Sequence, residues 1–212
     1  MSGSPIKLPV KNYLRLLLAT VVCLVTIHCI LNYYTHSISE VPWLLHQLFE
    51  LDEENNVPTW FSSFLLLNNA LVTLFMAQAR TDGLKIQWRL LSAGFLMLAI
   101  DEVAGLHESF HTAIDFSWVL PASLLVAVIG LSFIPFLIRL EKRLTIWFLI
   151  SGLLFVGGAL GIEILAQDMD EDTMSYGFAT AIEEGMEMLG AFLFLAVNLK
   201  ALQGVDLHLR FK

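Results

Sequence analysis

The chain has 212 residues, of which 57% are hydrophobic and only 15% are charged, and its formal net charge is −8. A soluble domain carries about 25% charged residues, so the composition excludes an ordinary soluble domain. The acidic balance also argues against a nucleic-acid partner, because such proteins present basic surfaces. The two cysteines, Cys23 and Cys29, imply no disulfide framework, and we expect them to pack within a helix.

Six apolar stretches are each long enough to cross a bilayer as a helix. They predict an all-α polytopic membrane protein that forms a single domain over residues 1–212. The first stretch follows basic residues and lacks a small-residue cleavage site, so we expect it to be a retained helix. The predicted spans, in chain order, are about 13–33, 59–79, 88–110, 118–138, 145–166 and 176–199.

Positive charge is confined to one side of this six-helix arrangement. All 12 Lys and Arg residues lie at or beyond the same ends of the predicted spans, whereas loops 34–58, 111–117 and 167–175 hold none. By the positive-inside rule, both termini are cytoplasmic (N-in, C-in) and these three loops lie outside. We expect the plasma (inner) membrane to be the location.

The first outer loop is the only predicted connection long enough to fold by itself. Pro42 can begin a short interfacial helix that carries Trp43, Leu44 and Leu48. An acidic turn follows, which we consider a candidate outer cation site, with ordinary solvation as the alternative. The residues of this candidate site are Asp52, Glu53, Glu54 and Asn55.

The end of the third predicted span reads IDEVAGLHESFH and places five ionisable residues between long apolar runs. At 100° per residue, Asp101, His107, Glu108 and His111 share one helical face about 120° wide, and Glu102 points elsewhere. His107, Glu108 and His111 form an HExxH pattern, in which two imidazoles bind a metal and the glutamate acts as a base. Glu108 and His111 also form the ExxH unit of di-metal carboxylate sites.

Further acidic residues fall at the same predicted depth, in a layer without Lys or Arg. Each ionised residue at membrane depth costs a few kcal/mol or more and is a candidate functional group. Protonation, a hydrated cavity or bound metal could each satisfy the acids, and the nearby histidines favour metal. The acids of this layer are Asp101, Glu102, Glu108, Glu163, Glu183, Glu184 and Glu187.

Three other polar residues of the predicted spans lie at a comparable depth. Asn68, Asn69 and His28 could support the metal site or contact a substrate, as Glu102 could, and helix–helix hydrogen bonds are the alternative. The histidines outside this layer, His36, His46 and His208, are expected on the surface.

Two fragments resemble the alkaline ceramidases, membrane hydrolases of the wider group that includes the adiponectin receptors. Residues 52–60, DEENNVPTW, are similar to that family's acidic segment, which opens a span and binds calcium. Residues 100–102, IDE, are similar to its Leu-Asp-Glu, whose aspartate serves a zinc site. The resemblance implies an outward-facing metal site and calcium at the first outer loop. That family has seven spans and a late His-x-x-x-His, whereas the last span here carries glutamates.

These patterns predict a membrane-embedded metalloenzyme that hydrolyses an amide or ester bond of a lipid or membrane peptide. His107 and His111 would hold the metal, Glu108 would act as base, and Asp101 would orient a ligand or share the metal. We favour zinc over iron or manganese, and a homo-oligomer is compatible with the sequence. The remaining ligand would come from Glu163, Glu183, Glu184 or Glu187.

Two other functions stay open at this point. A di-iron or di-manganese oxidase would use the same carboxylates as bridging ligands. A cation or proton transporter would use them as a relay. The inner halves of the predicted helices are nearly free of acids, which disfavours a transport path through the membrane.

Overall fold

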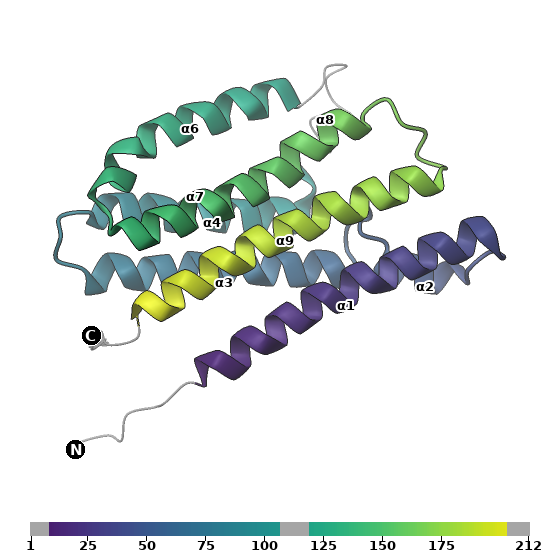
Figure 1. Cartoon of the computed structure of the whole chain (residues 1–212), viewed down its shortest axis with the longest axis horizontal. Coiled ribbons are helices and arrows are strands. Elements are labelled where there is room, and N and C mark those ends of the chain that lie inside the picture. The colour runs from purple at the N-terminus through teal and green to yellow at the C-terminus, as the bar shows by residue number, and fades with distance from the viewer. Residues whose placement is uncertain (1–8, 107–118, 203–212) are drawn as a thin grey trace.

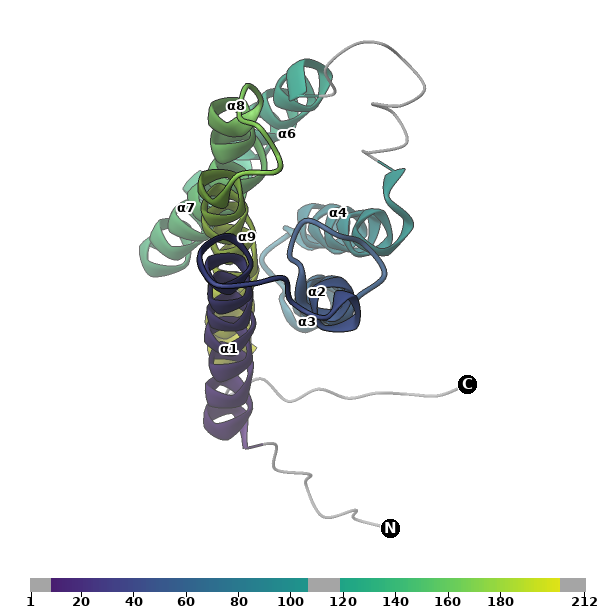
Figure 2. The same cartoon turned by 90° about the vertical axis from the view of Figure 1, so that its right-hand side faces the viewer.

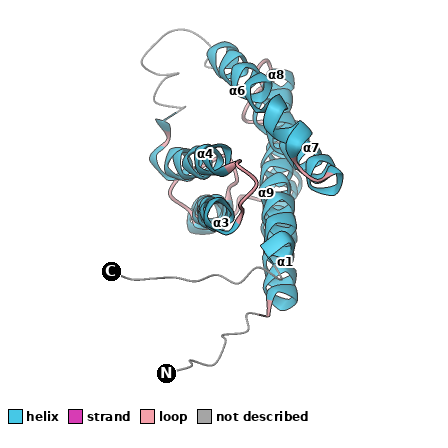
Figure 3. Ribbon diagram, turned by 90° about the vertical axis from the view of Figure 1, so that its left-hand side faces the viewer, coloured by secondary structure: helices cyan, strands magenta, loops and turns pink. Residues whose placement is uncertain are grey.

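The computed structural model describes residues 9–106 and 119–202, and within these residues it contains helices and connecting loops but no strand (Figure 3). The elements are α1 (Val10–Ser37), α2 (Trp43–Phe49), α3 (Val57–Ala79), α4 (Lys85–Ala104), α6 (Val119–Arg139), α7 (Lys142–Val156), the π-helical turn η1 (Gly157–Ile162), α8 (Glu163–Ala166) and α9 (Met174–Leu202).

Five helical segments are long and apolar enough to cross a membrane, and their bounds agree with five of the predicted spans to within a few residues. The predicted all-α membrane class is therefore confirmed. Helix α4 is the sixth long helix, but charged residues near both of its ends shorten its apolar stretch. The five segments are Val10–Ser37, Val57–Ala79, Val119–Arg139, Lys142–Ala166 and Met174–Leu202.

The helix predicted for the third span, 88–110, is interrupted at Gly105. Helix α4 stops at Ala104, and Gly105 adopts a left-handed conformation with φ 56°. Glycine reaches this conformation without a Cβ clash, which makes it a common helix terminator. The helix predicted to carry one continuous face from Asp101 onward is therefore broken after Ala104. His107, Glu108 and His111 themselves lie outside the described residues.

The long helices run side by side, and the molecule has two chemically different ends (Figure 1). At one end α1 begins, α9 ends, and the chain reverses between α3 and α4 and between α6 and α7; we call this the basic end. The described Lys and Arg residues all lie toward it. The opposite, acidic end carries loops 38–56 and 167–173, including the predicted short helix, which is α2.

Seen along their axes, α1, α9, α7 and α6 follow one another in a row, and the α3–α4 hairpin lies to one side of it (Figure 2). Helix α9 packs against α1, α3, α7 and η1, so it is the centre of the fold. Its buried side chains Met188 and Leu195 join a core with Leu65 and Leu66 of α3 and Leu24 of α1.

A second core closes the basic end with aromatic rings. Trp88 of α4 is fully buried and stands edge-on to Phe136 of α6 and Phe148 of α7, with ring centroids 5.2 Å and 5.8 Å away. Phe194 of α9 stacks on Phe148 at 4.3 Å. Such edge-to-face and offset pairs add to the stabilisation from buried apolar area. This aromatic core fastens α4 to α6, α7 and α9 at the end opposite the acidic loops.

Glycines set the spacing between α9 and the α7–η1 segment. A Cβ on Gly190 would lie 2.7 Å from the backbone nitrogen of Phe155 and 2.8 Å from the carbonyl oxygen of Ser151. A Cβ on Gly158 would lie 2.6 Å from the carbonyl oxygen of Glu183. Neither backbone can move aside as a side chain would, so the two helices approach this closely only because these positions lack a side chain.

We therefore predict that Gly190→Ala destabilises the protein by about 1–3 kcal/mol, because it overpacks a backbone contact. The matched control is Gly152→Ala in α7, where an added Cβ meets nothing within 4 Å and alanine should raise helix stability slightly. Thermal unfolding of both variants in the same detergent measures the difference. Equal shifts for the two substitutions would contradict the close approach of α9 and α7.

Candidate functional site

Six of the predicted acidic residues gather on three helices toward the acidic end. Each side chain is half-buried. Glu184 interacts electrostatically with Glu187, Glu102 and Glu183, and Glu187 interacts with Asp101 and Glu163 as well. We call this set the carboxylate cluster. It consists of Asp101 and Glu102 from α4, Glu163 from α8, and Glu183, Glu184 and Glu187 from α9.

Local backbone features bring these helices together. The π-helical turn η1 widens the helix just before Glu163, and such turns often occur at functional sites. Gly158 within η1 lets this segment approach the backbone of α9 at Glu183. At the end of α4, the Glu54 carboxylate of the first outer loop fills the space beside Gly105. The first outer loop therefore contacts α4 just before the HExxH segment.

The cluster gathers six carboxyl groups on helices that are otherwise largely apolar. Every described Lys and Arg lies toward the opposite end of the helices, so among the described residues none of these side chains offers the cluster a compensating charge. Clustered ionised carboxylates repel one another and are costly to bury. No three His, Cys, Asp or Glu side chains of the described chain segments stand close enough to hold a metal ion by themselves.

Two predicted supporting residues, Asn68 and Asn69, make helix–helix contacts. Asn69 is fully buried and donates from Nδ2 to the carbonyl of Ala191, 2.9 Å away, which ties α3 to α9. Asn68 accepts a hydrogen bond of 2.9 Å from the Tyr13 hydroxyl through Oδ1, which ties α3 to α1. Both contacts give these amides a role in helix packing.

The third predicted supporting residue, His28, belongs to a different group of residues. Its ring is 1% exposed, and Nε2 lies 2.8 Å from the carbonyl of Gly177 at the start of α9. Its Nδ1 lies 3.0 Å from Oε1 of Glu50, whose Oε2 lies 3.2 Å from Nε2 of His46. His28 therefore connects the first outer loop to α1 and α9.

Glu50 is ionised under ordinary conditions in this arrangement. Burial alone would raise the pKa of its carboxyl, but the hydrogen bond to His28 and the nearby charges of His28 and His46 outweigh burial and hold the pKa below its ordinary value. A carboxyl with a lowered pKa stabilises the fold above its ordinary pKa, and this contribution is lost only as the pH falls through the lowered value.

The predicted outer cation segment, residues 52–55, forms a compact turn into α3. Asn56 caps α3 by accepting from the backbone nitrogen of Thr59 at 3.1 Å, and the Thr59 hydroxyl donates to the carbonyl of Glu53 at 3.1 Å. The Tyr176 hydroxyl of α9 donates to the Asp52 carboxylate at 3.2 Å. These bonds give the turn a structural role, and calcium binding there stays a prediction.

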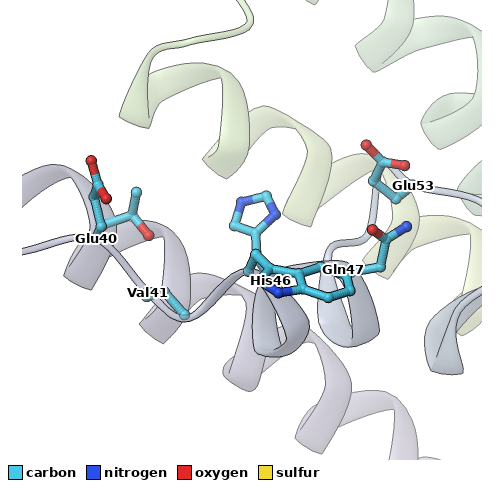
Figure 4. A pocket seen from close by; sticks show the side chains of 7 residues that line it. Glu40, Val41, His46, Gln47 and Glu53 are labelled. Carbon is cyan, nitrogen blue, oxygen red and sulfur yellow. The ribbon is translucent and has the colours of Figure 1, made fainter.

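The outer loops line an open pocket of about 360 Å³ between α1, α2 and α9. A second pocket of about 330 Å³ lies beside it, and Glu40, His46, Gln47 and Glu53 are among its lining residues (Figure 4). The residues of the first pocket that bear on its chemistry are Asn32, His36, His46, Glu50, Asp52 and Tyr176.

Our sequence reasoning missed Glu50 and the contacts of His36 and His46, although both histidines are exposed as expected. One signal could have indicated part of this group. His28, Asn32 and His36 recur every four residues, so they form a polar stripe along one face at the end of an otherwise apolar span. Glu50 gave no comparable signal, because it precedes an acidic run that solvation explains equally well.

The fold and the site define an integral membrane helix bundle with an acidic cluster at one end and an aromatic core at the other. The chain belongs to the family described as a domain of unknown function (DUF8692), whose model matches residues 15–201. It has no significant match among curated proteins or solved structures. The resemblance to the alkaline ceramidases therefore stays a prediction.

Proposed function

We propose that the protein is a membrane-embedded metalloenzyme with its metal near the carboxylate cluster. The observation that carries this proposal is that Glu184 and Glu187 on α9 lie within electrostatic range of Glu102 on α4, toward the end opposite the described Lys and Arg residues. A divalent cation would offset repulsion that no described Lys or Arg can offset. Oxygen ligands from several helices of a bundle are a known way to build such a site.

The proposed ligands combine this cluster with the HExxH segment. His107 and His111 would bind the metal together with one acid, Glu163, Glu183, Glu184 or Glu187. Glu108 would take a proton from the attacking water, and Asp101 would orient a ligand. The substrate class is an amide or ester of a lipid or membrane peptide, because the cluster lies on membrane-spanning helices. Zinc is the metal that HExxH favours.

A second candidate is a di-iron or di-manganese oxidase. The described members of the cluster are all carboxylates and come from three elements, α4, α8 and α9. Carboxylate ligands suit manganese and iron better than they suit zinc. This composition favours the oxidase, whereas the HExxH pattern favours the hydrolase.

A transporter receives less support. Trp88, Phe136, Phe148 and Phe194 pack together toward the basic end, and their apolar rings offer no relay for cations or protons beyond the cluster.

Metal analysis tests the central proposal. Protein purified without chelator should contain zinc, iron or manganese near a whole-number ratio, and His107→Ala with His111→Ala should remove most of it. The matched control, His36→Ala with His46→Ala, changes two exposed histidines outside the cluster and should retain the metal. Metal-free wild-type protein, or equal loss in both double variants, would contradict the proposed site.

The same sample separates the two enzymes. A zinc site is colourless and redox-silent, whereas a di-iron site has ultraviolet–visible and Mössbauer signatures and responds to oxygen.

We further propose that the acidic end faces away from the cytoplasm and that α4 completes a six-span topology, as the positive-inside rule favours. In a Cys23→Ser, Cys29→Ser background, single cysteines at exposed Glu53 and Asp170 should react with an impermeant thiol reagent in intact cells. A cysteine at exposed Thr81 should not react until the membrane is opened. The reverse labelling pattern would invert the orientation.

A further inference from the structure

The polar stripe of α1 binds three different segments at the acidic end. Asn32 donates from Nδ2 to the carbonyl of Met174 at 3.0 Å, which joins α1 to the start of α9. An amide makes this bond at any pH. His28 and His36 flank Asn32 on the same face, and each imidazole places both of its ring nitrogens near a partner.

His28 faces two partners that compete for one atom. Its Nε2 must donate to the carbonyl of Gly177, because a carbonyl only accepts. Its Nδ1 lies 3.0 Å from the Glu50 carboxylate, which requires a proton on that nitrogen, and 3.2 Å from the backbone N–H of Leu51, which requires a lone pair there. An imidazolium therefore pairs with Glu50, whereas a neutral ring accepts from Leu51 and gives up Glu50.

The hydrogen bonds of His36 also depend on whether its ring is protonated. Its Nδ1 lies 2.8 Å from the carbonyl of Asn32 within α1, and its Nε2 lies 3.2 Å from the carbonyl of Asp172 in the loop before α9. Both partners only accept, so both bonds form together only when the ring carries two protons. A neutral ring can keep only one of these two hydrogen bonds. When it keeps the shorter bond to Asn32 within α1, the carbonyl of Asp172 loses its donor.

We infer that His28 and His36 form a proton-dependent latch, in which two imidazolium rings on α1 hold the first outer loop at Glu50 and the third outer loop at Asp172. Loss of one proton from each ring releases the third outer loop at Asp172 and exchanges the charged contact of the first outer loop at Glu50 for a neutral hydrogen bond from Leu51, while Asn32 continues to hold α9. The latch closes the acidic end over the pocket and leaves the helix bundle itself unchanged.

The surrounding charges favour the closed latch at lower pH. His28 faces Glu50 and, at longer range, Asp52. Apart from His36 itself, His46 is the one ionisable group lining the pocket beside His36 that can be positive. Since the bound state fits the protonated rings, the latch is present at lower pH and is lost as the pH rises through the range in which histidines titrate. The lowered pKa of Glu50 keeps that acceptor charged on the acidic side. The other ionisable groups that line the pocket are Glu50, Asp52, Glu53, Glu171, Asp172 and Tyr176.

Distance measurement between spin labels on the two outer loops tests this latch in the full chain, reconstituted in lipid nanodiscs. Labels at exposed Gln47 and Asp170, in the Cys23→Ser, Cys29→Ser background, report the two loops. The distance distribution should be narrow near pH 5.5 and become about twofold broader near pH 8. A label pair at exposed Thr81 and Glu141, at the basic end, should show no such change.

The variants identify the responsible rings. His28→Gln with His36→Gln should give the broad distribution at both pH values, and His46→Gln should keep the pH dependence. His36 is exposed, so His36→Gln alone should fold and lose part of the change. A wild-type distribution that is equal at both pH values would overturn the latch, as would pH dependence that survives in the double variant or disappears in His46→Gln. No metal or substrate enters this measurement, so its outcome is independent of the proposed enzyme.

Discussion

Replacing Glu108 with glutamine should lower hydrolysis by about 10²–10⁴-fold and leave the bound metal in place, since general-base catalysis contributes about that much. Glutamine has nearly the same shape as glutamate but cannot take a proton from the attacking water. Activity on amide and ester lipids, together with metal content, should be measured on the same preparation. The control is Glu40→Gln, an exposed acid of the first outer loop, which should change neither quantity.

The same substitution separates the two candidate enzymes. In a di-metal oxidase Glu108 is a ligand, so Glu108→Gln should cost metal as well as activity. Full activity in Glu108→Gln would remove this residue from the mechanism and would leave HExxH without its proposed base.

Replacing Glu184 and Glu187 together with glutamine should weaken metal binding at least about a hundredfold, because loss of outer partners alone costs a metal site about 10–100-fold. The two residues differ by three positions, so their side chains lie on one face of α9, and both interact with the acids of α4. Titration of metal-free protein with zinc, manganese and iron measures the change. The matched control is Asp168→Asn with Glu171→Gln, which also removes two charges but from exposed positions.

A different result for this double variant would change the assignment. If Glu184→Gln with Glu187→Gln retains its metal and unfolds at a higher temperature, the two acids do not coordinate. Relief of repulsion between these half-buried carboxylates would then explain their effect, and a proton-linked transporter would become the leading candidate.

Most of the fold followed from the sequence because a membrane helix is specified locally. About 20 apolar residues satisfy both the bilayer and the backbone hydrogen bonds of one helix, so five spans could be predicted without their neighbours. The end of α4 was harder to predict, because Gly105 stops the helix there, whereas glycine is also common inside membrane helices. Periodicity alone could not show that the face shared by Asp101 and His111 is interrupted.

The carboxylate cluster was predicted in part because depth in the membrane, like helix formation, is specified locally along the chain. Depth along a helix follows from residue number, so Glu163 and Glu187 could be assigned to one layer before their helices were placed. Their proximity depends on which helices are neighbours, and close glycine contacts at Gly158 and Gly190 decide that for α9. These contacts involve residues far apart in the chain, and no periodic pattern encodes them.

Composition and charge distribution were sufficient to establish a membrane helix bundle with acidic and basic ends, since both depend on sums along the chain. The latch required the three-dimensional arrangement. Glu50 meets His28 and Asp172 meets His36 only after the outer loops fold back onto α1, and a hydrogen bond depends on distances of a fraction of an ångström. Sequence separation does not determine such distances, whereas the packing of α9 against α1 does.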